Sequence, residues 1–472
     1  MASPARDFRN KVQDDHPGST IIERGRRHIK HLTPDGTYIL DTSLGPVHYG
    51  SQFDQEIDTA WVDSIAPWDK QMTRAGYNAY ALTEFSNGQV VKYVHPTSGE
   101  QITFQPQQLQ FTNDIDQIQS IGDPQSISAT IDDDELQWAG AYGTDLDFTW
   151  ETQTSRLAKK LTIGSLASLG TPAQYIIDGG NPVLRLQFIF QVSSNVDLYI
   201  SDELWDKTKT KETDSVVEFR NKTTGQPLWW FGYAHVTDQG ANEIIATQRF
   251  TKRANSLFVE VRVPWSWLET ASYPVIVDPT VEPQIGASAD DAMAYPGTFS
   301  YTSSSCFLGN DGGYNNQGYR FTVTVPKDAV ISTSYLTITA NDNLTTDTVR
   351  TEIAYEDLND PGNFESNNET TFNARARSST VTTWDFTTDW TTDSEYNSAS
   401  LNTMLTALFA ESYWASGEHA VIFVDDDSSS TNAYRRSYSY DGSTTKCAVL
   451  HIEYSDLTPC LLYTSPSPRD RS

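Results

Sequence analysis

Aromatic rings beside arginines are the side chains of this sequence that most clearly suggest a chemistry. Tyr434, Arg435 and Arg436 follow one another, and Trp390 stands among threonine and aspartate residues. Aromatic faces stack on the C–H faces of sugar rings, and a guanidinium donates paired hydrogen bonds to a carboxylate. We therefore expect Trp390, Tyr434, Arg435 and Arg436 to form a carbohydrate-binding site, with Trp390 exposed to solvent.

Clustered carboxylates suggest a structural calcium ion as the one cofactor to consider. Asp290 and Asp291 are adjacent, and Asp311 lies beside Asn310 in a glycine-rich stretch. Calcium binds carboxylate and carbonyl oxygens of this kind. The run 425–427 is an alternative, and neither group has EF-hand spacing. We expect either calcium at Asp290, Asp291 and Asp311 or no cofactor.

The sequence contains no motif of an established catalytic machinery. Phosphate-binding loops, zinc-protease helices and nucleophile elbows are all missing. The run Asp132–Glu135 could supply the acid and base of a glycosidase, although adjacent carboxylates in a polar stretch usually form a solvated loop. We therefore expect no enzyme activity and no catalytic residues.

Short alternating segments predict an all-β chain. In 257–263, Leu257, Val259, Val261 and Val263 share one face of a predicted strand. Many such segments, separated by Gly, Asn and Asp, favour two main β-sandwich or jelly-roll-like domains in series with little helix. One helix is predicted from the spacing of apolar residues over 401–409, with Ser400 as its cap.

Two prolines mark the expected domain boundary. Pro274 and Pro279 flank the apolar run 275–277, which predicts a terminal strand with a stiff exit. We expect an arm over 1–30, a β-rich module over 31–282 that could contain two sub-lobes, and a jelly roll over 286–454. A disordered tail follows over 455–472, and its residues 460–472 resemble a translated sequencing adapter.

Charge and composition exclude several classes of partner. The formal net charge is −29, and an acidic surface repels nucleic-acid phosphates and anionic lipid. No apolar run is long enough to span a membrane, and the first residues lack the apolar core of a secretory signal. The three cysteines are too few for a disulfide framework; Cys306 and Cys447 are expected as buried free thiols, with a bridge between them as the alternative.

A basic cluster over residues 24–31 stands out in so acidic a chain. Its members are Arg24, Arg26, Arg27, His28, Lys30 and His31. It could dock an acidic partner surface, but a solvated strand edge is the simpler interpretation.

Three stretches of the C-terminal region together resemble a known family. The segment 318–336 is similar to the pattern RF-x-V-x-IP-x-GA-x-I-x-x-A-x-L, and 414–418 to W-x-SGN. The segment 436–454 resembles closing strands of the form R-x-x-SY followed by P-x-L-x-I-x-Y. This set is similar to the DNRLRE-type domain, a jelly roll grouped with carbohydrate-binding modules. The chain departs from the pattern at Asp328 and Ala448.

The upstream region resembles the β-rich module that precedes this domain in phage virion proteins and bacterial YD-repeat surface proteins. That module also ends in YPV-x-x-DPT, as 273–280 do here. The resemblance implies a non-enzymatic phage structural protein, such as a tail, fibre or adhesin-like component, in the virion or outside the cell. Its partners would be a host-surface glycan or other virion proteins, and it could form a homotrimer. A fragment of a bacterial adhesin and a polysaccharide-active enzyme with a binding module remain the alternatives.

Overall fold

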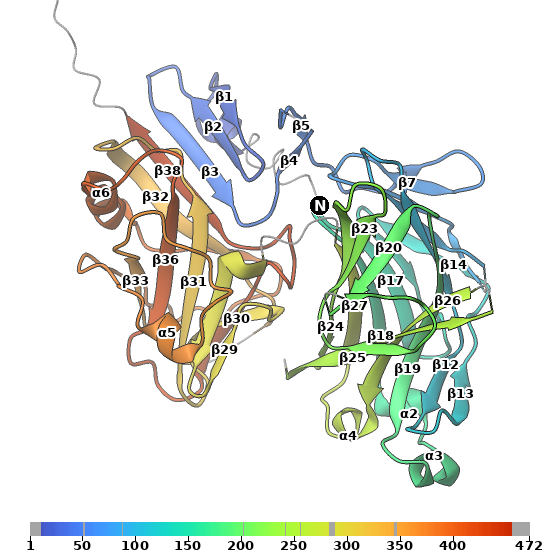
Figure 1. Ribbon diagram of the computed structural model, residues 1–472. Coiled ribbons are helices and arrows are strands. Elements are labelled where there is room, and N and C mark those ends of the chain that lie inside the picture. The colour runs from blue at the N-terminus through green and yellow to red at the C-terminus, as the bar shows by residue number, and fades with distance from the viewer. Residues whose placement is uncertain are drawn as a thin grey trace, which may run out of the picture.

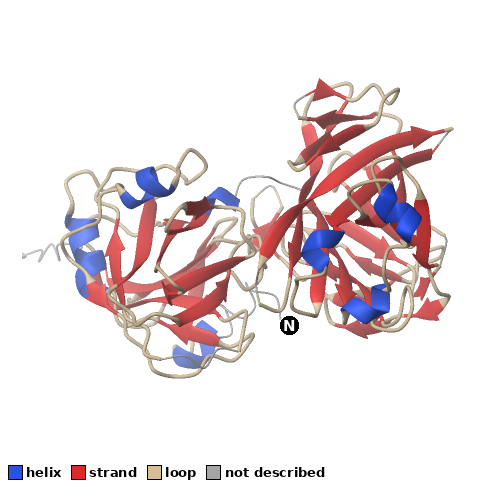
Figure 2. Ribbon diagram, turned by 90° about the horizontal axis from the view of Figure 1, so that it is seen from below, coloured by secondary structure: helices blue, strands red, loops and turns tan. Residues whose placement is uncertain are grey.

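The protein folds into two all-β modules that lie side by side (Figure 1). The structure, a computed structural model, describes residues 11–50, 52–86, 88–201, 203–240, 242–254, 256–282, 288–343 and 347–455. The first ten residues of the expected arm and residues 456–472 of the expected tail lie outside these ranges. Strands dominate both modules and helices are short (Figure 2), so the predicted all-β class is confirmed.

The N-terminal module, residues 52–282, consists of two antiparallel sheets. The first contains β6 (Val62–Asp63), β7 (Lys70–Met72), β8 (Asn78–Ala81), β10 (Val91–Val94), β11 (Gln101–Pro106), β12 (Leu109–Thr112), β13 (Ile118–Gly122), β19 (Val183–Val192), β22 (Lys211–Thr213), β25 (Glu243–Arg253) and β26 (Ser256–Pro264). The second contains β15 (Thr130–Asp132), β16 (Glu135–Trp138), β17 (Leu146–Thr152), β18 (Leu157–Ile163), β20 (Val196–Ile200), β21 (Glu203–Leu204), β23 (Val217–Asn221), β24 (Pro227–Thr237) and β27 (Val275–Glu282). Pairing of β24 with β25 joins the two sheets along one side.

Short elements complete this module. They are β9 (Glu84–Phe85) with β14 (Ile127–Ser128), and the helices α2 (Leu166–Leu169), α3 (Gln174–Asp178) and α4 (Trp265–Leu268). In addition, β5 (Gln55–Glu56) pairs with β4 (His48–Tyr49) of the segment that precedes the module.

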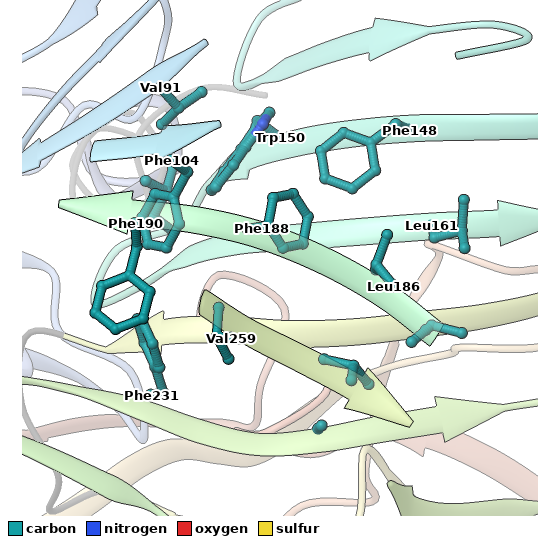
Figure 3. Close-up of a cluster of buried hydrophobic side chains, with 14 of the residues drawn as sticks. Val91, Phe104, Phe148, Trp150, Leu161, Leu186, Phe188, Phe190, Phe231 and Val259 are labelled. Atoms are coloured by element: carbon teal, nitrogen blue, oxygen red, sulfur yellow. The ribbon is translucent and has the colours of Figure 1, made fainter. Parts of the chain in front are cut away.

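Aromatic rings fill the space between the two sheets (Figure 3). The ring centroid of Phe104 lies 5.5 Å from that of Trp150 and 5.9 Å from that of Phe231. Full burial of such a side chain contributes about 1.5–3 kcal/mol. Lys159 is also buried here, with its Nζ 4.8 Å from the centroid of Phe104.

The proline-bracketed segment forms β27, an inner strand between β18 and β24. It is longer than the predicted strand and runs through Pro279, which pairs with Ala234 of β24. On the other side the register to β18 passes from Val277 to Val281, so Pro279 has no partner there. Proline lacks the N–H that a ladder on both sides would need.

The C-terminal module is a sandwich of two further sheets. The first has the order β1 (Thr20–Arg24), β2 (His28–Leu32), β3 (Tyr38–Ser43), β38 (Val449–Ser455), β32 (Val330–Thr339) and β35 (Glu395–Asn397). The second has the order β29 (Thr298–Ser300), β28 (Asp291–Tyr295), β31 (Tyr314–Thr322), β36 (His419–Asp426), β33 (Thr351–Tyr355) and β34 (Thr382–Thr383), with β30 (Ser305–Asn310) bridging β31 to β37 (Ala433–Tyr438). The helices are η1 (Ser288–Asp290), α5 (Glu369–Asn373) and α6 (Asn402–Ala410).

The N-terminal strands belong to the C-terminal module, which differs from the expected division at residues 30 and 31. Strand β3 pairs with β38 from Tyr38–Tyr454 to Ser43–Val449, and the blue strands lie against the dark red strand in Figure 1. Leu40 and Leu44 are fully buried in the core of this module. The N-terminal strands join this module because β38 would otherwise be an open sheet edge with unpaired backbone groups.

The core between these sheets also takes up one face of α6. Met404, Leu405, Leu408 and Phe409 are buried, as their spacing predicted. Leu401, not Ser400, is the N-cap, and it makes no side-chain capping bond. Cys306 and Cys447 are buried free thiols, as expected. Within the described residues, no helix has the length and apolar character that crossing a membrane requires.

Candidate functional site: a groove at the junction of the modules

A groove of about 480 Å³ lies where the β24–β25 turn of the N-terminal module meets β28, β29 and β30 of the C-terminal module. We call it the junction groove. Its lining residues are Gly240, Asn242, Glu243, Ile244, Ile245, Met293, Tyr295, Thr298, Ser300, Thr302, Ser303, Phe307, Asp311, Asn315 and Arg436. Both modules therefore contribute to one concave surface, the usual form of a ligand site.

Three aromatic rings lie in or beside the groove. Tyr295 ends β28 and is 36% exposed, so its ring is available to a ligand. Phe307 of β30 is half-buried, and its ring stacks with Tyr434 of β37 at a centroid distance of 5.9 Å. The pairing of β30 with β37 sets this contact, because Phe307 is opposite Arg436 and Tyr434 is two residues away. Sugar rings pack on such partly exposed faces.

Arg436 joins the two modules at the base of the groove. Its Nη2 donates to the carbonyl oxygen of Gly240 at 2.8 Å, and its Nη1 pairs with Asp342 at 3.0 Å. The guanidinium lies 4.9 Å from the ring centroid of Phe307 and 5.4 Å from that of Tyr434. Arg436 is buried, so it fixes the aromatic pair and the β24–β25 turn and is not a free carboxylate binder.

Glu243 fixes the opposite wall. Its carboxylate accepts hydrogen bonds from the backbone N–H of Ser304 at 3.1 Å and from the Ser304 hydroxyl at 2.8 Å. His235 lies 2.6 Å away on the other side. Burial alone would raise the pKa of Glu243, but these hydrogen bonds hold it below its usual value. Burial alone would lower the pKa of His235, but Glu243 raises it, so the pair is an ion pair that holds the wall in place.

The remaining lining groups are small and polar. They are the amides of Asn242 and Asn315, the exposed carboxylate of Asp311 and the hydroxyls of Thr298, Ser300, Thr302 and Ser303. Amides, carboxylates and hydroxyls are the partners that sugar hydroxyls require. A groove with exposed aromatic faces and this polar set can hold a saccharide segment.

The structure brings together only some of the residues expected to bind sugar. Arg436 lines the groove and Tyr434 stacks behind Phe307. The expectation that Trp390 is exposed is wrong, since it is 2% exposed and lies between Phe386 and Tyr396. The ring of Tyr396, 4.5 Å away, takes the position that a sugar would need.

Arg435 is also a core residue, because adjacent residues on a strand point to opposite faces. It is fully buried and donates to the carbonyl oxygens of Tyr434 and Thr388 at 2.9 Å each. Arg435 and Arg436 therefore cannot serve one ligand.

The expected calcium ligands have other partners or positions. Arg27 and Arg320 approach the two carboxylate oxygens of Asp290 at 2.5 and 2.8 Å. Asp291 accepts the backbone N–H of Tyr440 at 2.7 Å, and burial raises its pKa well above the usual value, which favours the neutral form. Asp311 lies apart from both, on the rim of the junction groove. No group of three His, Cys, Asp or Glu that could hold a metal occurs in the described part of the chain.

A neighbouring cleft of about 320 Å³ gathers the charged groups that could act as acid or base. His235, Asp342 and Lys160 line it, and each is already paired, with Glu243, Arg436 and Glu151 respectively. Asp278 and Asp441 also have partners. This network connects the modules around the groove.

Tyr295, Phe307 and Asn242 were missed at the sequence level. Tyr295 precedes Pro296-Gly297, a turn signal, and an aromatic residue next to a turn is a candidate for exposure. Nothing local indicates that Gly240 and Asn242 would face it, because this contact joins two modules.

No family model matches the chain, and no curated protein matches it. Among solved structures, the tandem CBM22-1–CBM22-2 domain of Paenibacillus barcinonensis Xyn10C is 10% identical over 68% of this chain and 91% of that chain, with a TM-score of 0.15. A Paenibacillus xanthan lyase is 8% identical over 94% of this chain, with a TM-score of 0.14, and the match spans 40% of the lyase. Scores this low carry no argument about what this chain does.

Proposed function

We propose that this chain is a non-enzymatic glycan-binding protein that holds a segment of polysaccharide in the junction groove. The observation that carries the proposal is the exposed ring of Tyr295 beside the stacked Phe307–Tyr434 pair, within a wall of amides and hydroxyls. The ring faces would pack against sugar C–H groups, and the polar wall would exchange hydrogen bonds with sugar hydroxyls.

The groove is already formed in the free protein, which favours binding. Arg436 and Glu243 hold its two walls through contacts between the modules. A ligand therefore does not have to order mobile side chains, and less binding free energy is lost.

We further propose that the protein is a surface component of a phage particle. The similarity of its motifs to the DNRLRE-type domain supports this, as does an acidic surface suited to solution outside the cell. Its partners there would be a host-surface glycan and other virion proteins. A homotrimer would multiply a weak single-site contact into useful avidity.

A glycan-array screen of the full chain tests the groove. We expect Tyr295→Ala to weaken binding of the best glycan by roughly two- to twelvefold, since a contact with one aromatic ring contributes on the order of 0.5–1.5 kcal/mol. Tyr175→Ala is the matched control, because Tyr175 is 46% exposed on α3 at a distance from the groove. Equal losses in both variants, or no binding by the parent protein, would refute the groove.

Two further observations test the biological setting and the chemistry. Flanking genes for capsid and tail proteins, and labelling of intact particles by an antibody to the chain, would support the virion role. A secretion signal on a longer reading frame would favour the bacterial adhesin. New reducing ends from a bound polysaccharide would overturn the non-enzymatic assignment.

A further inference from the structure

A second pocket of about 500 Å³ lies on another part of the junction, where the N-terminal segment crosses the N-terminal module. We call it the Arg26 pocket. Its lining residues are Arg26, Pro46, His48, Tyr49, Gly50, Phe53, Ile57, Ala75, Gly76, His95, Pro96, Thr97, Thr154 and Ser155.

Arg26 brings an unmatched positive charge into this pocket. Two of its neighbours in the basic cluster are neutralised, since Arg27 pairs with Asp290 at 2.5 Å and Lys30 with Glu23 at 2.8 Å. No carboxylate of the described residues lies within salt-bridge distance of Arg26, although the chain has 62 acidic residues and a net charge of −29. Burial lowers the pKa of Arg26, so the free protein carries a desolvated charge that an anionic ligand would stabilise.

His48 adds a second, independent group without a partner. It is 1% exposed, its Nδ1 lies 2.8 Å from the carbonyl oxygen of Gly25, and its Nε2 is buried without a hydrogen-bond partner among the described residues. A carbonyl oxygen can only accept, so Nδ1 carries the hydrogen. Burial lowers the pKa of His48, which favours the neutral ring, and Nε2 is then an acceptor without a donor.

The backbone holds Arg26 and His48 in place relative to one another. The carbonyl oxygen of Arg26 accepts the N–H groups of Val47 at 2.7 Å and His48 at 3.1 Å. The ring of Phe53, 36% exposed, and that of Tyr49 supply apolar faces in the same pocket. A ligand that combines an anionic group, a hydroxyl and an apolar face would match all three features.

We propose that the Arg26 pocket binds a carboxylated sugar residue, a hexuronic acid at the end of or within an acidic polysaccharide. The sugar carboxylate would pair with the Arg26 guanidinium, a ring hydroxyl would donate a hydrogen bond to Nε2 of His48, and the C–H face of the sugar would pack on Phe53. Inorganic phosphate fits less well, because it has no apolar face. This site is separate from the junction groove, and its assignment does not rest on the proposed function of that groove.

Isothermal titration of the full chain with glucuronate, tri-galacturonate and glucose tests the proposal. We expect an acidic sugar to bind at least tenfold more tightly than glucose, and Arg26→Gln to abolish that preference. Arg350→Gln is the matched control, because Arg350 is an exposed arginine of the C-terminal module that does not line the pocket. It should change the affinity less than twofold, and Tyr295→Ala should leave it unchanged.

Circular dichroism and the melting temperature must show that Arg26→Gln is folded, and His48→Gln provides a second variant that keeps Arg26. We expect His48→Gln to weaken glucuronate binding while the preference over glucose persists. Equal binding of glucose and glucuronate by the parent protein would overturn the proposal. Equal losses in Arg26→Gln and Arg350→Gln, or inorganic phosphate competing as well as glucuronate, would also overturn it.

Discussion

Removing the N-terminal strands should unfold the C-terminal module even though its own residues, 288–455, are all retained. Strand β3 pairs with β38 over six residues, and Leu40 and Leu44 are fully buried in that core. Burial of the two leucines contributes about 3–6 kcal/mol. A domain is stable by only about 5–15 kcal/mol in total, so this loss alone removes much of it and leaves β38 as an open edge.

Two fragments and two point variants test this. Residues 288–455 alone should be insoluble or show no cooperative melting transition by calorimetry and circular dichroism. The same residues joined through a flexible linker to 11–50 should melt cooperatively. In the full chain, Leu40→Ala should cost about 2–5 kcal/mol, whereas Ile22→Ala, at a 47% exposed position of β1, should cost much less.

A cooperative melting transition of 288–455 alone, within a few degrees of that of the linked fragment, would contradict this prediction. Equal losses of stability in Leu40→Ala and Ile22→Ala would contradict it as well. Either result would mean that the sandwich closes without β3.

Two further predictions concern buried charges. Burial alone would lower the pKa of His451, but Asp41 at 2.6 Å and Glu453 raise it to about 9. The protonated ring therefore stabilises the folded state by at most about 3 kcal/mol, fully below pH 6.5 and progressively less as the pH rises through 9. Calorimetry of His451→Gln should show no such decline in stability. Burial lowers the pKa of Lys159 to about 7, so the parent N-terminal module should gain stability between pH 7 and 10. Lys159→Met should raise the free energy of unfolding at pH 7 by up to about 4 kcal/mol and remove this dependence on pH. A lower melting temperature of Lys159→Met would contradict the prediction.

Local patterns in the sequence predicted the elements but not all of their partners. The alternation at 257–263 correctly placed Val259, Val261 and Val263 in the core, and the spacing at 401–409 correctly predicted α6. Both signals depend only on residues that are close in the chain. The pairing of β3 with β38 depends on residues at opposite ends of the chain, and no local pattern indicates it.

The sites show the same limit. Threonine and aspartate neighbours suggested that Trp390 is exposed, but Phe386 and Tyr396 bury it from positions that sequence spacing did not connect. Arg436 was expected to bind a sugar carboxylate, but it is buried and its partner is the carbonyl oxygen of Gly240 in the other module. The Arg26 pocket depends on the absence of a carboxylate in space, which composition alone cannot show.

The placement of β3 beside β38 has a consequence for synthesis on the ribosome. Asp41 and its partner His451 are separated by 410 residues. At about 5–20 residues per second, the first strands emerge roughly 20–80 s before the last one exists. During that interval the N-terminal module can fold by itself while the free edge of β3, in the β1–β2–β3 sheet, has no partner. The nascent chain must therefore keep this edge from pairing with another copy until translation is complete.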